Sequence, residues 1–77
     1  MKVKVEHIAL LKCDNLPADR EVELPSPATV GDLLHVLGIR PEHHGVIIPF
    51  INSERAKRTS SLSDGDEVFL SMAVGGG

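Results

Sequence analysis

A chain of 77 residues has room for one domain, and its 42% hydrophobic and 25% charged residues argue against a collagen-like, coiled-coil or disordered protein. The net charge of −3 and the scattered Lys and Arg residues argue against a nucleic-acid partner. The single cysteine excludes an internal disulfide. Because there is neither an apolar stretch of about 18 residues nor a leader-like N-terminus, we expect a cytoplasmic protein without a membrane partner.

The N-terminal third predicts an antiparallel hairpin. Val3 and Val5 alternate with charged residues, which is typical of a strand with one buried face. From Ile8 to Leu11 the sequence becomes apolar, which indicates a twist, a bulge or burial on both faces. Turn-forming residues in 12–19 then reverse the chain into a second strand that contains Val22.

Residues 28–38 predict a short helix with a marked start and a marked end. Thr29, followed three residues later by Asp32, is a typical N-terminal capping sequence. Gly38 suits the left-handed position that ends a helix, and Ile39 is expected to fold back on Leu34. The apolar stripe of this helix consists of Leu33, Leu34, Val36 and Leu37.

The rest of the chain predicts two more main strands. Residues 45–52 form an apolar run, which is typical of a central strand buried on both faces, although Pro49 implies a bulge or a locally unpaired edge. Residues 53–63 lack the apolar period of a helix and leave room for one minor strand. Asp64 and Gly65 predict a tight reversal before a last strand in residues 67–74.

A hairpin, one helix and a last strand able to pair in parallel with the first predict an α+β, β-grasp (ubiquitin-like) fold. We expect a mixed four- or five-stranded sheet with one main helix over residues 1–74, followed by a flexible Gly-Gly-Gly tail over residues 75–77. The predicted core includes Val3, Val5, Leu33, Leu37, Ile47 and Val68.

The C-terminus is the part of the sequence that suggests chemistry. Gly75, Gly76 and Gly77 can extend about 10 Å from the domain and enter a channel too narrow for any Cβ atom. The terminal carboxylate is ionised at neutral pH and is a competent nucleophile toward the α-phosphate of ATP. The tail is therefore interpreted as a substrate, and we expect no catalytic residue in this chain; a frayed tail without function is the alternative.

Nearly the whole chain resembles the β-grasp sulfur carriers, a family that includes the small subunit of molybdopterin synthase (MoaD) and the sulfur carrier of thiamine biosynthesis (ThiS). The resemblance rests on KVKVEHIALLK, on ATVGDLLHVLG and, most specifically, on SDGDEVFLSMAVGGG. The opening strand and the length look more like the molybdopterin branch. Asn52 and Ser53 stand where that branch usually has an Asn-Gly turn.

The resemblance implies that a ubiquitin-activating-type adenylyltransferase uses ATP and magnesium to adenylate Gly77, and that a persulfide donor then supplies sulfur for a thiocarboxylate. It also implies a sulfur-accepting synthase, either the molybdopterin synthase large subunit or thiazole synthase. Gly75 and Gly76 would provide steric clearance, and no bound cofactor is expected. Two alternatives are a ubiquitin-like modifier conjugated through the same C-terminus and a non-covalent interaction module.

Three apolar residues near the tail are expected either in the core or in a patch that docks partners, namely Phe69, Met72 and Val74. Val68, Leu70 and Met72 share one face of the last strand and Phe69 lies on the other, but the sequence does not show which face meets the helix.

The other chemically notable residues have ordinary structural interpretations. His43 and His44 are expected to be a solvent-exposed loop pair, because no zinc-site spacing surrounds them, and no metal site is predicted. Cys13 has no activating motif and is expected to be inert. The basic residues Arg55, Lys57 and Arg58 are interpreted as a solvated loop or, less favourably, as a patch for an acidic partner.

Overall fold

The computed structural model describes residues 1–11 and 13–73, which form one mixed sheet and one main helix. The strands are β1 (Lys2–His7), β2 (Glu21–Glu23), β3 (Ile47–Ile51), β4 (Glu54–Arg55) and β5 (Glu67–Met72). The helices are α1 (Val30–Val36) and the 3-10 helix η1 (Pro41–Val46). The predicted α+β, β-grasp (ubiquitin-like) fold is confirmed, including the minor strand.

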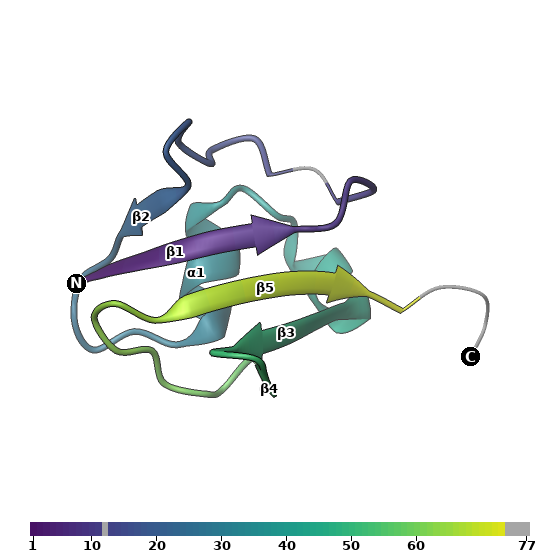
Figure 1. Cartoon of the computed structure of the whole chain (residues 1–77). Coiled ribbons are helices and arrows are strands. Elements are labelled where there is room, and N and C mark those ends of the chain that lie inside the picture. Colours follow the sequence, from purple (N-terminus) through teal and green to yellow (C-terminus); the bar gives the residue numbers. More distant parts are fainter. Residues whose placement is uncertain (12, 74–77) are drawn as a thin grey trace.

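The sheet has the strand order β2-β1-β5-β3-β4. β1 and β5 pair in parallel, as the sequence predicted, whereas the other neighbours pair antiparallel. β5 is thus the middle strand, and it ends on the same side of the molecule as β1 (Figure 1). The strand that leads into the C-terminal tail is therefore hydrogen-bonded on both edges.

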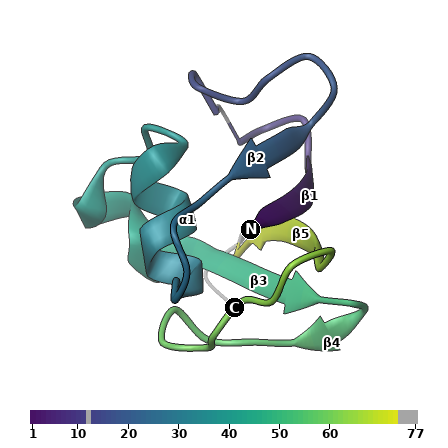
Figure 2. The ribbon, with the colours of Figure 1, turned by 90° about the vertical axis from the view of Figure 1, so that its left-hand side faces the viewer.

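The core lies between α1 and one face of the sheet (Figure 2). All six residues predicted for the core are buried: Val3, Val5, Leu33, Leu37, Ile47 and Val68. Among the described residues, no helix covers the opposite face of the sheet (Figure 2). This open face is available for contacts with other molecules.

The capping signals place α1 as expected. Thr29 Oγ1 accepts a hydrogen bond from the backbone N–H of Asp32 at 3.3 Å, and Asp32 Oδ2 accepts one from the N–H of Thr29 at 2.9 Å. Gly38 has a φ of +81°, and the N–H of Ile39 donates to the carbonyl of Leu34 at 3.1 Å. These bonds satisfy backbone groups that a helix leaves unpaired at its ends.

The turn at residues 64–66 joins the beginnings of β1 and β5. Asp64 Oδ1 accepts from the N–H of Lys2 at 2.7 Å, and Asp66 Oδ2 accepts from the N–H of Ser63 at 2.8 Å. Gly65 adopts a φ of +86°, the left-handed region that favours glycine. The tight reversal predicted at Asp64 and Gly65 is confirmed, and the Asp64 carboxylate links this turn to the start of β1.

The twist, bulge or burial on both faces expected for Ile8 to Leu11 is not what the structure has, because this segment lies beyond the strand. β1 ends at His7, and the N–H of Leu11 donates to the carbonyl of Ile8 at 3.1 Å, so the apolar segment forms a turn. Leu11 is buried whereas Leu10 is 75% exposed. The apolar run therefore reflects a loop whose side chains divide between the core and the surface.

β3 is an inner strand paired on both edges, but the predicted burial on both faces is wrong, because only Ile47 and Pro49 of this strand are buried. β3 lies fourth in the sheet, beside the short edge strand β4, and β5 occupies the centre. The carbonyl of Pro49 accepts from the N–H of Ala56 at 2.9 Å, so the amide that proline lacks would face the edge strand rather than β5. The predicted unpaired edge at Pro49 is consistent with this arrangement.

Within residues 1–11 and 13–73, no helix has the length and apolar character needed to cross a bilayer.

Candidate functional site

The chain leaves the sheet at the end of β5, which is the candidate functional end of the molecule. The backbone N–H of Ala73 donates to the carbonyl of Val46 at 2.8 Å, so the chain stays bonded to the domain for one residue beyond β5. The predicted tail residues Gly75, Gly76 and Gly77 and the predicted docking residue Val74 lie outside the described residues.

The strand that supports this end is firmly held. Val68 and Leu70 point into the core and are buried, and they pair with Val5 and His7 of β1 on one side and with Ile51 and Pro49 of β3 on the other. A strand buried in this way does not fray easily, because opening it exposes core side chains and breaks two ladders of hydrogen bonds. The tail is thus attached to a fixed point.

Phe69, one of the predicted docking residues, lies on the open face of the sheet. It is 39% exposed, and its ring centroid lies 6.3 Å from that of Phe50 on β3, with the rings tilted by 48°. The two rings line a hollow of about 370 Å³, here called the aromatic hollow, whose lining residues are Glu6, Phe50, Ser53, Glu67, Val68 and Phe69. The aromatic hollow combines an apolar floor with two carboxylates.

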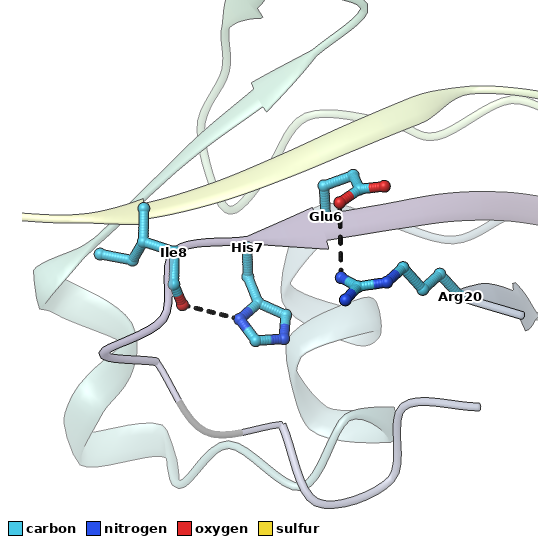
Figure 3. Close-up of polar contacts among 4 residues, drawn as sticks. All are labelled: Glu6, His7, Ile8 and Arg20. Atoms are coloured by element: carbon cyan, nitrogen blue, oxygen red, sulfur yellow. Dashed lines mark hydrogen bonds and ion pairs between the residues drawn. The ribbon is translucent and has the colours of Figure 1, made fainter. Parts of the chain in front are cut away.

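One of those carboxylates is paired at the end of β1 (Figure 3). Arg20 Nη1 lies 3.4 Å from Glu6 Oε2, and both side chains are exposed, so the pair adds little to stability. His7 Nδ1 lies 2.8 Å from the carbonyl of Ile8, and since a carbonyl only accepts, Nδ1 carries the proton (Figure 3). Both contacts help to hold the chain where β1 turns into its loop.

Met72, the second predicted docking residue, lies on the other side of the sheet from Phe69. It lines a hollow of about 340 Å³ at the end of β5, here called the end hollow, formed by Leu10, Leu11, Ile39, His43, Val46, Ile47 and Met72. Phe69 and Met72 thus belong to two different surfaces. Leu10 and Val46, the exposed apolar residues of the end hollow, were not predicted, because their exposure depends on the loop and on η1.

The prediction that both histidines lie in an exposed loop is wrong. They belong to η1, and only His43 is exposed, whereas His44 is buried with its Nε2 2.8 Å from the carbonyl of Ile39. The carbonyl only accepts, so Nε2 donates. His44 therefore joins η1 to Ile39, three residues beyond the end of α1, and this contact is a structural one.

Cys13 and the basic residues between β3 and β5 are the other notable side chains. Burial, and to a lesser degree the charge of Asp14, raises the pKa of the Cys13 thiol, which opposes a reactive thiolate. Arg55, Lys57 and Arg58 are exposed, as predicted. Among the residues that the structure describes, no group of three or more His, Cys, Asp or Glu side chains is arranged to hold a metal ion.

Comparison with known proteins identifies the family. The sequence pattern of the ThiS family matches residues 10–77. The chain belongs to the ThiS family. Because the match runs through Gly77, the glycine tail is part of the ThiS-family pattern. A search of curated protein sequences finds no match.

Solved structures that are similar to this ThiS-family chain include the following two. SAMP1 from Haloferax volcanii is 25% identical, with 100% of each chain covered and a TM-score of 0.67. A putative molybdopterin converting factor, subunit 1, from Pyrococcus furiosus is 27% identical, covers 95% of this chain and 98% of its own, and has a TM-score of 0.70. The chain is thus a small ubiquitin-fold protein of the sulfur-carrier or small-modifier type, a type that is generally not catalytic itself.

Proposed function

We propose that this chain is a sulfur carrier whose Gly77 carboxylate is adenylated and then converted to a thiocarboxylate that donates sulfur in cofactor biosynthesis. One observation carries the proposal: the family pattern continues through three terminal glycines, which begin three residues after the end of a central strand held on both edges. A fixed strand followed by residues without side chains is suited to insertion into a partner's active site. The proposal locates this chemistry in the cytoplasm.

The chemistry needs two partners and no catalytic group in this chain. In the first step a carboxylate oxygen of Gly77 attacks the α-phosphate of ATP, pyrophosphate leaves, and a mixed anhydride with AMP forms. ATP and magnesium belong to the ubiquitin-activating-type adenylyltransferase. This step makes the carbonyl carbon electrophilic, which the free carboxylate is not.

Sulfur enters in the second step. The terminal sulfur of a persulfide donor attacks the activated carbonyl carbon, and AMP leaves with one of the original carboxylate oxygens. A thiol then cleaves the S–S bond, the donor sulfur is released in a disulfide with that thiol, and one sulfur stays on Gly77 as a thiocarboxylate. The net change on the carrier is the exchange of one oxygen for one sulfur.

Partner proteins would recognise the carrier by binding the surface of its β-grasp domain. Phe69 on the open face and Met72 at the end of the strand are exposed or half-buried apolar side chains of β5, which leads to the tail, and Val74 comes two residues after Met72 in the sequence. Such side chains commonly anchor protein interfaces. We therefore propose Phe69, Met72 and Val74 as docking residues, with Gly75 and Gly76 providing clearance.

The sulfur acceptor that we favour is a molybdopterin synthase large subunit. The Pyrococcus furiosus relative, named as a putative molybdopterin converting factor subunit, supports this branch at 27% identity. Thiazole synthase is the acceptor if the chain serves thiamine biosynthesis instead.

A second candidate function has its own support. SAMP1, whose name describes a small archaeal modifier protein, aligns with the entire chain at 25% identity. Conjugation to protein lysines would use the same adenylated C-terminus, but an amine instead of a persulfide would attack the carbonyl. Isopeptide-linked adducts of this chain in cells would favour the modifier function.

ATP–pyrophosphate exchange with the ubiquitin-activating-type adenylyltransferase of the same genome tests the shared first step. We expect exchange with the natural chain, and none after deletion of Gly76 and Gly77 or after extension beyond Gly77, because the carboxylate is then displaced or becomes an internal amide. A non-covalent interaction module would not need the glycines. Equal exchange by an extended chain that mass spectrometry shows to be untrimmed would overturn the proposal.

A further inference from the structure

We infer that the end hollow is the surface on which the adenylating partner seats an apolar side chain while it holds the C-terminal tail. This inference rests on the proposed function, because it names where the partner of that reaction binds. The end hollow is formed by residues from the loop after β1, from η1 and from the end of β5. These segments are far apart in the sequence and meet only in the folded chain.

The first support is the apolar lining of the end hollow, which includes two exposed aliphatic side chains. Leu10 and Val46 are 75% and 41% exposed, although large aliphatic side chains are usually buried. The other lining residues are apolar apart from His43, and among residues 1–11 and 13–73 no Asp, Glu, Lys or Arg lines it. The aromatic hollow differs, because Glu6 and Glu67 border it. The end hollow is therefore suited to an aliphatic or aromatic side chain rather than to a charged group.

The second support is the position of the end hollow at the tail. Val46 and Met72 both line it, and Ala73, which follows Met72, donates its N–H to the carbonyl of Val46 at 2.8 Å. The last described residue is thus bonded to the wall of the end hollow. Ala73 therefore lies beside the end hollow, whereas none of the described residues after Phe69 lines the aromatic hollow.

The third support is the short reach of the chain beyond Ala73. Four residues separate it from the end of the sequence, and an extended backbone spans at most about 3.6 Å per residue, so the Gly77 carboxylate stays within roughly 14 Å of Ala73. A protein that encloses this carboxylate in an active site has to approach the domain that closely. The rim on which Leu10 and Val46 are exposed lies beside Ala73 and is therefore a surface that such a protein can contact.

The test uses two valines of equal exposure. Val46→Ser and Leu10→Ser remove apolar surface from the end hollow, and Val36→Ser is the matched control, since Val36 is 40% exposed on α1 and does not line the hollow. Each full-length variant is titrated against the adenylyltransferase in ATP–pyrophosphate exchange, and circular dichroism checks its fold. Sedimentation measures whether the chain self-associates.

We expect Val46→Ser and Leu10→Ser to raise the carrier concentration for half-maximal exchange about tenfold, which corresponds to about 1.4 kcal/mol of binding free energy, while Val36→Ser leaves it unchanged. Unchanged half-saturation in both hollow variants overturns the inference and leaves the proposed function intact. Loss of a dimer without a change in half-saturation also overturns it, because a second copy would then be the occupant. If the natural chain supports no exchange, the proposed function and the inference both fail.

If the Val46→Ser protein does not fold, Leu10→Ser alone still tests whether the end hollow binds the adenylyltransferase. Leu10 is exposed in a loop, so its replacement removes little buried surface and is not expected to change the fold. An equal loss of affinity in Val36→Ser would contradict the inference, because it would show a general effect of polar surface substitutions.

Discussion

Asn52 joins the turn after β3 to the start of β5 by hydrogen bonds to Asp66 and Glu67. Its Nδ2 donates to Asp66 Oδ1 at 3.0 Å, and its Oδ1 accepts from the N–H of Glu67 at 3.0 Å. The backbone N–H of Asn52 also donates to the carbonyl of Glu67 at 2.8 Å. The strand that leads to the tail is thus held at its beginning by one side chain from a neighbouring turn.

Replacing Asn52 by glycine isolates the contribution of these side-chain bonds. Asn52 has a φ of 51°, which glycine adopts without strain, so the backbone is expected to keep its shape. We expect Asn52→Gly to lower the free energy of unfolding by about 1–2 kcal/mol, since two hydrogen bonds are lost. Urea denaturation measures this change, and an unchanged midpoint would show that the bonds contribute nothing.

Replacing Ser53 in the same turn by glycine is expected to have the opposite effect on the free energy of unfolding. Its φ is 72°, in the left-handed region that is unfavourable for residues with a Cβ atom. We expect Ser53→Gly to raise the free energy of unfolding by about 0.5–1 kcal/mol, because the relief of strain exceeds the added freedom of glycine in the unfolded chain. Ser53→Ala is the control and should bring no such gain. A glycine variant no more stable than the alanine variant would contradict this account.

The start of α1 depends on Thr29. Its hydroxyl accepts the hydrogen bond from the N–H of Asp32, and Thr29→Ala leaves that donor without its partner. We expect a loss of about 1 kcal/mol in the free energy of unfolding, whereas Thr29→Ser should retain most of it. Thermal and urea unfolding of the three proteins measure the difference. Equal losses for alanine and serine would point to the methyl group rather than the hydroxyl.

Cys13 gives a prediction with a defined dependence on pH. Burial raises the pKa of its thiol in the folded chain, so the unfolded chain loses this proton at a lower pH than the folded chain. The free energy of unfolding should therefore fall as the pH rises through the ordinary pKa of a thiol, and Cys13→Ser should reduce that fall. Iodoacetamide should also react more slowly with the native protein than with the same protein in urea. Equal alkylation rates would exclude a protected thiol.

The sequence predicted the elements whose signals are local. Thr29 and Asp32 mark the start of α1, Gly38 marks its end, and the alternation around Val3 and Val5 identifies the buried face of β1. These signals depend only on neighbouring residues in the chain, so the elements that they predict form in the folded structure as expected. The parallel pairing of β1 with β5 followed from the order of the elements.

Other features depended on contacts between distant parts of the chain. The apolar run through Leu10 and the apolar strand β3 look equally buried in sequence, yet the first forms a partly exposed turn and the second lies beside an edge strand. His44 is buried because η1 brings it to the carbonyl of Ile39, which no local pattern indicates. The assignment of Phe69 and Met72 to different faces likewise required the strand register.

A bulky side chain at Gly76 tests whether the tail has to pass through a narrow channel. We expect Gly76→Val to abolish adenylation, because a β-branched side chain does not enter a channel shaped for glycine, and to leave the free energy of unfolding unchanged within about 0.5 kcal/mol. Ala73→Ser is the control, since it places a small polar change before the glycines. Full adenylation of the Gly76→Val chain would contradict the clearance role.

The most direct test of the central claim is the intact mass of the chain after incubation with the adenylyltransferase, ATP, magnesium, a persulfide donor and a thiol. The proposed function predicts a gain of about 16 Da, the difference between one sulfur and one oxygen atom, located on Gly77 and absent without ATP. A chain that forms the adenylate but never gains this mass, and is found instead in isopeptide linkage to lysines, would contradict the sulfur-carrier function.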